Sequence, residues 1–392
     1  MRKFSADLVY PVSGKPILNG VVITDDAGKI LAIERRDQYD SAGLEIYKGA
    51  IVPGFINTHC HLELSHMKGV APTGTGLLPF LNTVVALRNF DEETILAAIE
   101  AADREMYEAG IVAVGDISNK ADTASTKSKS KIRYYTFVEM FDFIQESLAE
   151  QTFENYYRVF EQQSDVNGNR KSCVPHAPYT VSKSLFQKIN SVNPEGCTVS
   201  IHNQETVHEN NFFLSKTGGF IDFYKGFNFS LDAFSPSGKT SVHYALEQMN
   251  PDCRTLFVHN TMSDEADIAA AQNWSDKTFW ATCPNANLYI ENRLPDYRNF
   301  QNQNVKMTIG TDSLTSNWQL SVLEEMKTIL RFQSYLDFET VLTWATLNGA
   351  QALGFEDQLG SIETGKTPGL VLLENLDRTG RLQSATTARR LI

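Results

Sequence analysis

A nine-residue stretch, THCHLELSH at residues 58–66, concentrates side chains that can bind a metal ion. It holds three of the eight histidines of the chain, together with a cysteine and a glutamate. His59 and His61 are two positions apart, so on a strand their side chains project from one face and both imidazoles can reach one ion. Cys60 projects from the other face and is expected to pack in the interior. The stretch predicts a metal site, against the alternative of two ordinary loop histidines.

Short apolar runs recur along the chain, with helical stretches between them. Near-continuous apolar strands that alternate with helices are typical of a parallel sheet covered on both faces. Eight runs predict eight strand–helix units and therefore an α/β fold, a (β/α)8 barrel of the TIM type. The runs are residues 50–59, 111–118, 132–140, 171–179, 198–205, 255–261, 278–287 and 305–313.

Ionisable residues accumulate where these predicted strands end. In a barrel the carboxyl ends of all strands meet on one face, where the loops build the active site. Histidines and a carboxylate together suit Zn(II) or Fe(II), with one position left for water. His66 lies in the loop after the first strand, and His208 and His243 fall outside this set. The strand-end residues are His59, His61, Asp116, Glu139, His176, His202, Glu205, His259 and Asp312.

The bulk composition limits the classes of partner. The 392 residues can form one large barrel or two ordinary domains. The net charge of −12 argues against nucleic acid and anionic membranes. There is no signal-peptide pattern and no apolar run long enough to cross a bilayer. Five scattered cysteines without a C-x-x-C pair suit free thiols in the cytoplasm. We expect a small-molecule substrate, with a homodimer left open.

The motifs carry a family resemblance. PGFINTHCH, followed by IHNQE, FVHN and IGTDS, resembles the amidohydrolase superfamily of metal-dependent hydrolases over nearly the whole chain. The first fifty residues look like a small β unit, with a hairpin that turns at residues 26–28. The resemblance implies that both termini build a small β-sandwich. The expected divisions are residues 1–52 and 357–392 for the sandwich and 53–356 for the catalytic barrel.

The resemblance also implies a metal-ligand set. Two-metal members usually bridge their ions with a carboxylated lysine at the end of strand four. Here His176 occupies that strand end, and Lys171 lies before the apolar part of the run. One divalent ion per chain is therefore expected, and His259 would hydrogen-bond the water on the metal. The implied ligands are His59, His61, His202 and Asp312.

Within the superfamily, the spacing H-x-x-E from His202 to Glu205 is similar to the deaminase branch, where the glutamate moves protons to a ring nitrogen. Glu205, His259 and Asp312 are the expected catalytic residues. The stretches HLELS, VGDISN, VPHAPY, ATCPNAN and TDSLTSNWQLSVLEEM resemble the aminodeoxyfutalosine deaminases of menaquinone biosynthesis. The resemblance implies hydrolytic deamination of an aminopurine nucleoside, 6-amino-6-deoxyfutalosine or a related adenine nucleoside, by attack of metal-activated water at C6 with release of ammonia.

Several alternatives stay open. Guanine deaminase, methylthioadenosine/S-adenosylhomocysteine deaminase, chlorohydrolase and amidase activities share this set of motifs. A non-catalytic protein of the same fold would be expected to lose ligands, and every expected ligand is present here.

Four residues are expected to contact substrate: His176, Glu205, Arg88 and Glu63. An aryl carboxylate such as that of aminodeoxyfutalosine needs a cationic or multiply hydrogen-bonding partner, because an unpaired buried charge is costly. Arg88 is the first candidate and Lys68 the second. The alternative for Arg88 is a solvated residue at a helix end.

Two segments could shape the pocket. Residues 65–90 are predicted to form a long loop after the first strand, and their Gly, Thr and Pro content suggests a mobile cover. Residues 210–234 are rich in phenylalanine. Such rings could stack on a purine, or they could form the core of an inserted helical pair or a dimer contact.

Overall fold

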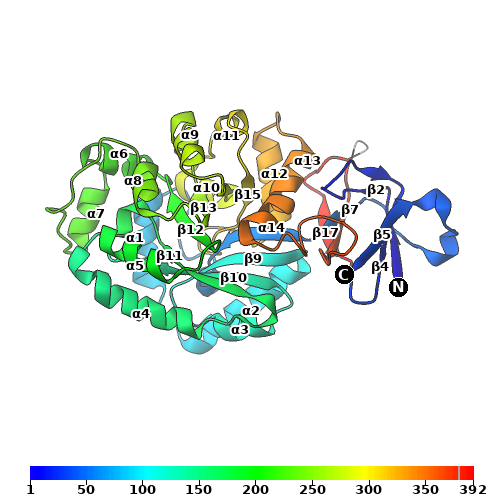
Figure 1. Ribbon diagram of the computed structural model, residues 1–392, viewed down its shortest axis with the longest axis horizontal. Helices are drawn as coiled ribbons and strands as arrows, with labels where there is room; N and C mark the ends of the chain where they lie inside the picture. The colour runs from blue at the N-terminus through cyan, green and yellow to red at the C-terminus, as the bar shows by residue number, and fades with distance from the viewer. Residues whose placement is uncertain (378–379) are drawn as a thin grey trace.

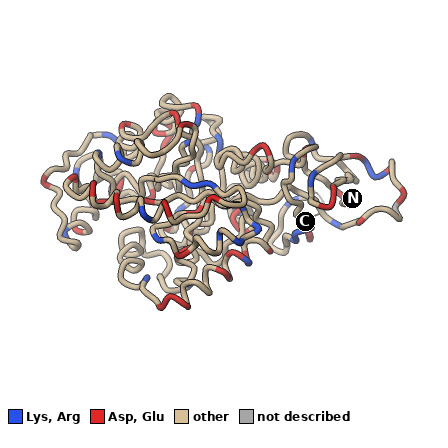
Figure 2. The backbone as a smooth tube through the Cα atoms, turned by 60° about the horizontal axis from the view of Figure 1, so that its bottom comes forward, with Lys and Arg blue, Asp and Glu red and all other residues tan. Residues whose placement is uncertain are grey.

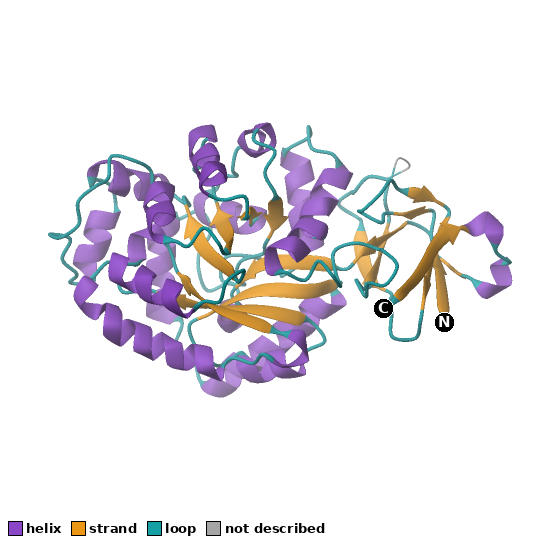
Figure 3. Ribbon diagram, in the orientation of Figure 1, coloured by secondary structure: helices purple, strands orange, loops and turns teal. Residues whose placement is uncertain are grey.

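The computed structural model describes residues 1–377 and 380–392. Helices surround parallel strands in the larger part of the molecule, and strands dominate the smaller part, which contains both chain ends (Figure 1, Figure 3). Basic and acidic residues are interspersed over both parts (Figure 2). Among the described residues, no helix is long and apolar enough to cross a membrane.

Eight strands form two parallel four-stranded sheets, so the predicted α/β class is confirmed. Each of the eight predicted apolar runs overlaps one of these strands, and β8, β11 and β13 each extend one residue beyond the run. In the first sheet, ordered β11-β10-β9-β8, they are β8 Phe55–Cys60, β9 Ile111–Ser118, β10 Arg133–Met140 and β11 Arg170–Pro175. In the second, ordered β12-β13-β14-β15, they are β12 Thr198–Asn203, β13 Arg254–His259, β14 Thr278–Thr282 and β15 Met307–Ile309.

Backbone contacts join the edges of the two sheets at the carboxyl ends of their strands. His202 N, on β12, donates to the carbonyl oxygen of His176 just past β11, at 2.9 Å. After β15, Thr311 N and Asp312 N donate to the carbonyl oxygen of His59 at 2.9 and 3.0 Å. Residues that follow strands of different sheets are therefore brought to one place.

The first predicted strand is wrong in one respect, because the run at residues 50–59 divides into two strands. β7 (Ala50–Pro53) pairs with β2 (Leu8–Val9) and β16 (Leu370–Glu374), whereas β8 pairs with β9. Gly54 separates them, and a Cβ there would lie 2.3 Å from Val112 Cγ1 and 2.7 Å from the Pro368 carbonyl oxygen. Only glycine allows this close approach at the junction.

Strands from both termini form the smaller part. The predicted hairpin is present, since β4 and β5 pair antiparallel and Gly28 N donates to Asp25 O across the turn. One sheet, ordered β5-β4-β1-β6, contains β1 Arg2–Ser5, β4 Gly20–Thr24, β5 Ile30–Arg35 and β6 Glu45–Ile46. The other, β17-β16-β7-β2-β3, adds β3 Ile17–Leu18 and β17 Thr387–Arg390. Both sheets supply one buried cluster that includes Phe4, Val22, Ile51, Leu370 and Leu372.

Helices follow the parallel strands. The loop predicted over residues 65–90 is partly wrong, because it contains α1, Leu77–Leu87. Leu77, Phe80 and Val84 of α1 are buried. The other helices are α2 Glu92–Glu108, α3 Ala124–Lys129, α4 Ala149–Gln162, α5 Lys183–Val192, α6 Val207–Ser215, α7 Phe220–Gly226, α8 Ser241–Gln248, α9 Glu265–Trp274, α10 Pro284–Glu291, α11 Tyr297–Asn302, α12 Val322–Phe332, α13 Phe338–Ala345 and α14 Leu347–Leu353.

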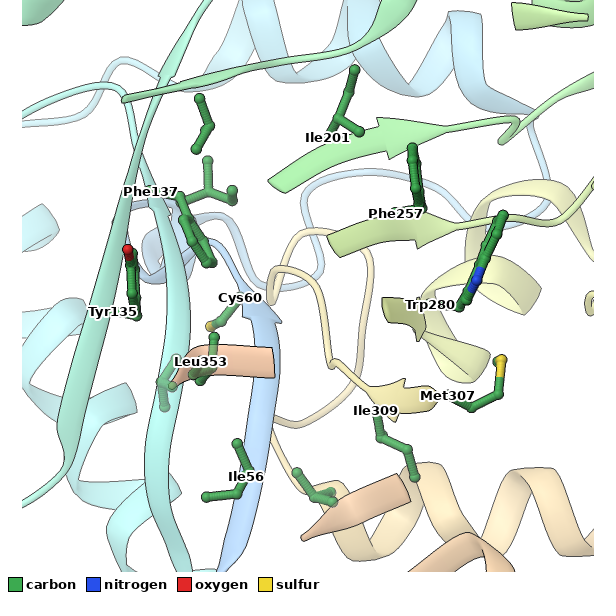
Figure 4. Close-up of a cluster of buried hydrophobic side chains, with 14 of the residues drawn as sticks. Ile56, Cys60, Tyr135, Phe137, Ile201, Phe257, Trp280, Met307, Ile309 and Leu353 are labelled. Carbon is green, nitrogen blue, oxygen red and sulfur yellow. The ribbon is translucent and has the colours of Figure 1, made fainter. Parts of the chain in front are cut away.

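The main core lies among the parallel strands. Figure 4 shows side chains from both sheets in this region, including Phe137, Phe257 and Ile309, all fully buried. Cys60 is fully buried in the same cluster, as expected from its place between the two histidines. This packing holds the strands and therefore the polar residues at their carboxyl ends.

Candidate active site

Four predicted ligands lie together where the edges of the two sheets meet. His59 and His61 come from the end of β8, His202 from β12 and Asp312 from the segment after β15. Nε2 of His61 lies 3.2 Å from Nε2 of His202, and Asp312 Oδ1 lies 3.7 Å from His59 Nε2 and 3.5 Å from His61 Nε2. Two groups of possible ligand atoms, each within 4.8 Å, overlap here: His59 with His61 and His202, and His59 with His259 and Asp312.

The donor atoms fit a divalent cation. His59 is fully buried, and neither of its ring nitrogens has a hydrogen-bond partner among the described residues. Leaving a buried polar atom unsatisfied costs free energy, and a bond to a metal would satisfy Nε2. His202 donates Nδ1–H to the His176 carbonyl oxygen at 2.9 Å, which leaves Nε2 free as a ligand. The 3.2 Å between the His61 and His202 nitrogens suits two bonds of about 2.0–2.1 Å to one ion.

Charge and burial prepare these groups as ligands. Burial lowers the pKa of His61 to about 3, so its imidazole is neutral at neutral pH. Burial by itself would raise the pKa of Asp312, but the His59 imidazole 3.7 Å away and the other neighbouring imidazoles hold it below its usual range. Ser316 Oγ donates to Asp312 Oδ2 at 2.6 Å, and Oδ1 faces the histidines.

The backbone at the cluster is held in uncommon conformations. His259 and Asp312 have φ angles of 70° and 57°, in the left-handed region. Such residues persist only where surrounding contacts enforce them, and they gather at functional sites. Gly310 permits the approach of the chain after β15, because a Cβ there would lie 2.7 Å from His59 Cβ.

Glu205 lies beside the cluster. Its Oε2 is 3.5 Å from His259 Nε2, and its Oε1 accepts a hydrogen bond from the Tyr179 hydroxyl at 3.3 Å. Burial, reinforced by the negative charge of Asp312, raises the pKa of Glu205 to about 8. The Glu209 carboxylate accepts the backbone N–H groups of Gln204 and Glu205 at 2.9 and 3.0 Å and so fixes the turn that carries Glu205. The site therefore combines a possible metal site with a carboxyl group that is protonated at neutral pH.

A pocket that is partly open to solvent extends from the cluster. One side consists of apolar side chains of α1, here called the α1 wall: Leu77, Phe80, Leu81, Val84 and Val85. The other side includes the strand-end residues His61, Glu139, His176, His202, Glu205, His259 and Asp312.

Only some of the residues predicted to contact substrate line the pocket. His176 lines the pocket, with Nδ1 2.7 Å from Thr180 Oγ1. Arg88 also lines it, but its Nη2 lies 3.3 Å from Oε1 of the buried Glu63. Glu63 is not among the pocket-lining residues, and Lys68 is exposed and does not line the pocket either.

Lys171 lies outside the metal cluster. Its Nζ donates to the carbonyl oxygens of Phe160 and Gln163 at 3.0 and 2.9 Å. Of the phenylalanine-rich segment, only Phe223 lines the pocket, whereas residues such as Phe212 are buried in the core.

Several residues at the site carried no role in the sequence prediction. Asn287, which does not line the pocket, has its Oδ1 2.8 Å from His259 Nδ1 and orients that ring. Tyr179, Asn119 and Phe141 line the pocket. Tyr179 and Asn287 belong to VPHAPY and ATCPNAN, but nothing in their spacing predicts their contacts. Glu139 shared the strand-end position of the predicted ligands, which was a usable signal.

Three imidazoles and a carboxylate at the ends of parallel strands, beside a protonated glutamate, define the class of metal-dependent hydrolases. Residues 50–388 match the amidohydrolase family. The chain belongs to this family and is a hydrolase that acts on carbon–nitrogen bonds.

Three of the similar proteins are deaminases. The aminodeoxyfutalosine deaminase of a Nitratiruptor species is 27% identical over 350 residues, covering 86% of this chain and 82% of the relative. Helicobacter pylori aminofutalosine deaminase in complex with methylthio-coformycin superposes with a TM-score of 0.80 at 22% identity, covering 98% and 94% of the two chains. An adenosine deaminase from Xanthomonas campestris with bound zinc gives a TM-score of 0.74 at 23% identity, covering 95% and 84%. The structural likeness shows a shared fold.

Proposed function

We propose that this chain is a metal-dependent hydrolytic deaminase of an adenine nucleoside, in which one water adds at C6 of the base and one ammonia leaves. The observation that carries the proposal is the position of Glu205, a buried acid with a raised pKa, in contact with His259 at the edge of the ligand cluster. The names of the relatives, deaminases of adenosine and of aminodeoxyfutalosine, support the same reaction.

In this proposal the chain binds one divalent ion, Zn(II) or Fe(II). When bound, such an ion lowers the pKa of water from about 15.7 to roughly 7, so that hydroxide is available at neutral pH. The zinc in the Xanthomonas campestris structure supports zinc as the first candidate. The proposed ligands are His59, His61, His202 and Asp312.

Glu205 would act as the proton carrier. Because its pKa is raised to about 8, the carboxyl group is protonated at neutral pH and can donate to N1 of the ring as oxygen adds to C6. The resulting carboxylate then accepts the proton of the attacking water and passes it to the amino group, which leaves as ammonia. His259 would accept a hydrogen bond from the attacking oxygen before Glu205 takes its proton, and Asp312 would help to orient that oxygen against C6.

As the particular substrate we propose 6-amino-6-deoxyfutalosine or a closely related adenine nucleoside. The α1 wall offers apolar surface for a bulky 5′ group. Arg88 contacts Glu63 through Nη2. A guanidinium group has five N–H donors, so others remain to pair with a carboxylate on that group.

We further propose that the eight parallel strands close into one (β/α)8 barrel over residues 53–356. Residues 1–52 and 357–392 would then form a β-sandwich. The hydrogen bonds from His202 to His176 and from Asp312 to His59 support closure on both sides. An experimental structure in which β11 and β12 lay apart would contradict the barrel. The five free cysteines support a cytoplasmic location.

Ammonia release from a substrate panel tests the function. The panel contains aminodeoxyfutalosine, adenosine, 5′-methylthioadenosine and guanine, assayed with metal-loaded enzyme. We expect the highest kcat/KM for aminodeoxyfutalosine. Guanine as the best substrate would reject the nucleoside assignment, and no ammonia from any member would reject the deaminase.

A further inference from the structure

The pocket contains a buried carboxylate that the proposed chemistry does not use. Glu139 is the next-to-last residue of β10, lines the pocket and is 3% exposed. It lies on the opposite side of the His202 ring from the ligand cluster, since its Oε2 is 3.4 Å from Nδ1 whereas Nε2 faces His61. Glu139 is therefore separated from the candidate metal site by the width of one imidazole ring.

The two carboxylate oxygens of Glu139 differ. Oε1 accepts a hydrogen bond from Asn119 Nδ2 at 3.1 Å, and the same amide also donates to the backbone oxygen of Glu139 at 3.1 Å. Oε2 is buried and has no hydrogen-bond partner within residues 1–377 and 380–392. The Nδ1–H of His202 is near but is donated to the His176 carbonyl oxygen. Burial raises the pKa of Glu139 to about 8, and a buried carboxyl oxygen without a partner costs free energy in either protonation state until a ligand supplies one.

A cation does not fill this role in the described part of the chain. The nearby guanidinium of Arg88 is paired with Glu63. Glu139, His176 and His202 have possible ligand atoms within 4.8 Å of one another, but Nδ1 of His202 carries a proton and cannot coordinate an ion. The missing partner is therefore a hydrogen-bonding group on the ligand.

We propose that Oε2 of Glu139 accepts hydrogen bonds from the vicinal hydroxyl groups of the sugar of the bound nucleoside. The inference rests on the proposed function. An adenine nucleoside has few donors, and its amino group must lie at the ligand cluster to react. The sugar is attached on the far side of the purine ring, so its hydroxyls are the donors that can reach Glu139. Hydroxyl groups both donate and accept, so the pair can bond to Oε2 whether or not Glu139 carries a proton.

The test compares adenosine with 2′,3′-dideoxyadenosine in the metal-loaded wild type and in Glu139→Gln. In the variant, the amide oxygen stays on Asn119 Nδ2, which needs an acceptor, and the NH₂ group replaces Oε2. We expect the wild type to favour adenosine in kcat/KM by roughly 5- to 150-fold, the usual range for two hydrogen bonds. The preference should shrink to about threefold or less in Glu139→Gln. An unchanged preference would overturn the inference while leaving the deaminase intact.

A matched control separates substrate binding from support of His202. Asp142→Asn makes the same chemical change just after β10, at a buried carboxylate that accepts from Ser182 and does not line the pocket. It should keep the wild-type preference for adenosine. If Glu139 only orients His202, Glu139→Gln should lower metal content and reduce kcat/KM equally for both nucleosides, and that result would also overturn the inference.

A binding measurement makes the inference independent of turnover. Calorimetry compares inosine with 2′,3′-dideoxyinosine in the wild type, in Glu139→Gln and in Glu139→Ala. We expect inosine to bind more tightly in the wild type only. If the wild type showed no preference for inosine, whether both ligands bound or neither did, the inference would fail. A preference without ammonia release would leave it standing and reject the deaminase alone.

Discussion

The two sides of the pocket are built from different kinds of contact. On the strand-end side, buried polar groups are held by directed hydrogen bonds, such as His202 to the His176 carbonyl oxygen and Ser316 to Asp312. The α1 wall is apolar, and Val85 on it is 50% exposed. Directed contacts fix atoms to a fraction of an ångström, whereas apolar contacts depend mainly on area. Changes on the strand-end side should therefore affect the reaction, and changes on the α1 wall should affect which substrate binds.

The largest effect is expected from His59→Ala combined with His61→Ala. Removing two nitrogen ligands should abolish metal binding and reduce turnover to background, since no other group supplies hydroxide at neutral pH. Elemental analysis of protein purified without added metal should find about one divalent ion per wild-type chain. His243→Ala, at a histidine 3.8 Å from Asp267 and outside the pocket, is the control and should keep the metal. Two ions per chain, or metal retained in the double variant, would contradict the one-metal site.

Glu205→Gln should lower kcat by about 10²–10⁴-fold, the usual contribution of general acid–base catalysis. The amide cannot deliver a proton to N1, but it preserves the volume and can still meet the Tyr179 hydroxyl. Metal content and circular dichroism should match the wild type. A near-normal kcat would remove Glu205 from the mechanism.

Arg88→Ala tests whether Arg88, which follows the α1 wall in the chain, binds a carboxylate of the substrate. If Arg88 pairs with a substrate carboxylate, kcat/KM for aminodeoxyfutalosine should fall by roughly 10- to 150-fold, which corresponds to a loss of about 1.5–3 kcal/mol in binding free energy. The kcat/KM values for adenosine and 5′-methylthioadenosine should stay nearly constant. Lys68→Ala, at an exposed lysine outside the pocket, is the matched control and should change none of the three. An equal loss on all three substrates would reject the pairing and assign Arg88 to support of Glu63.

The pH dependence of kcat in the wild-type enzyme should also report the ionisation of Glu205. Glu205 has a pKa raised to about 8, and its protonated form is the active one, so activity is full below that value and lost above it. We expect kcat to fall about tenfold per pH unit above this point. The residual activity of Glu205→Gln should lack this limb. A wild-type profile flat to pH 10 would contradict the assignment.

The smallest effect is expected on the α1 wall. Val85→Ala removes two methyl groups from a half-exposed position. At about 0.8 kcal/mol per buried CH₂, KM for substrates with a large 5′ group should rise by roughly two- to tenfold, and kcat should not change. Adenosine, which lacks this group, serves as the internal control. A fall in kcat would show that the two sides of the pocket are coupled.

The strand-end side of the pocket could be predicted from the sequence better than the α1 wall. All eight parallel strands overlap the predicted runs, to within one residue at the ends of β8, β11 and β13, because a continuous apolar stretch that ends in polar residues is a local signal. α1 was missed because the Gly, Thr and Pro residues before it indicate a loop, and because Leu77, Phe80 and Val84 are buried only by distant parts of the fold. The division of β7 from β8 was missed because both halves are apolar and differ only in their pairing partners.

The sequence by itself determined the order of the strands and the kinds of side chain that follow them, because strand formation and side-chain alternation are local properties. Only the tertiary structure decided which of these side chains meet. His202 and Asp312 lie 110 positions apart, yet both reach His61 because the two sheets join at the carboxyl ends of their strands. The pairing of Arg88 with Glu63 and the open oxygen of Glu139 have the same origin. Contacts between residues distant in the chain depend on how whole sheets and helices pack, which no local pattern encodes.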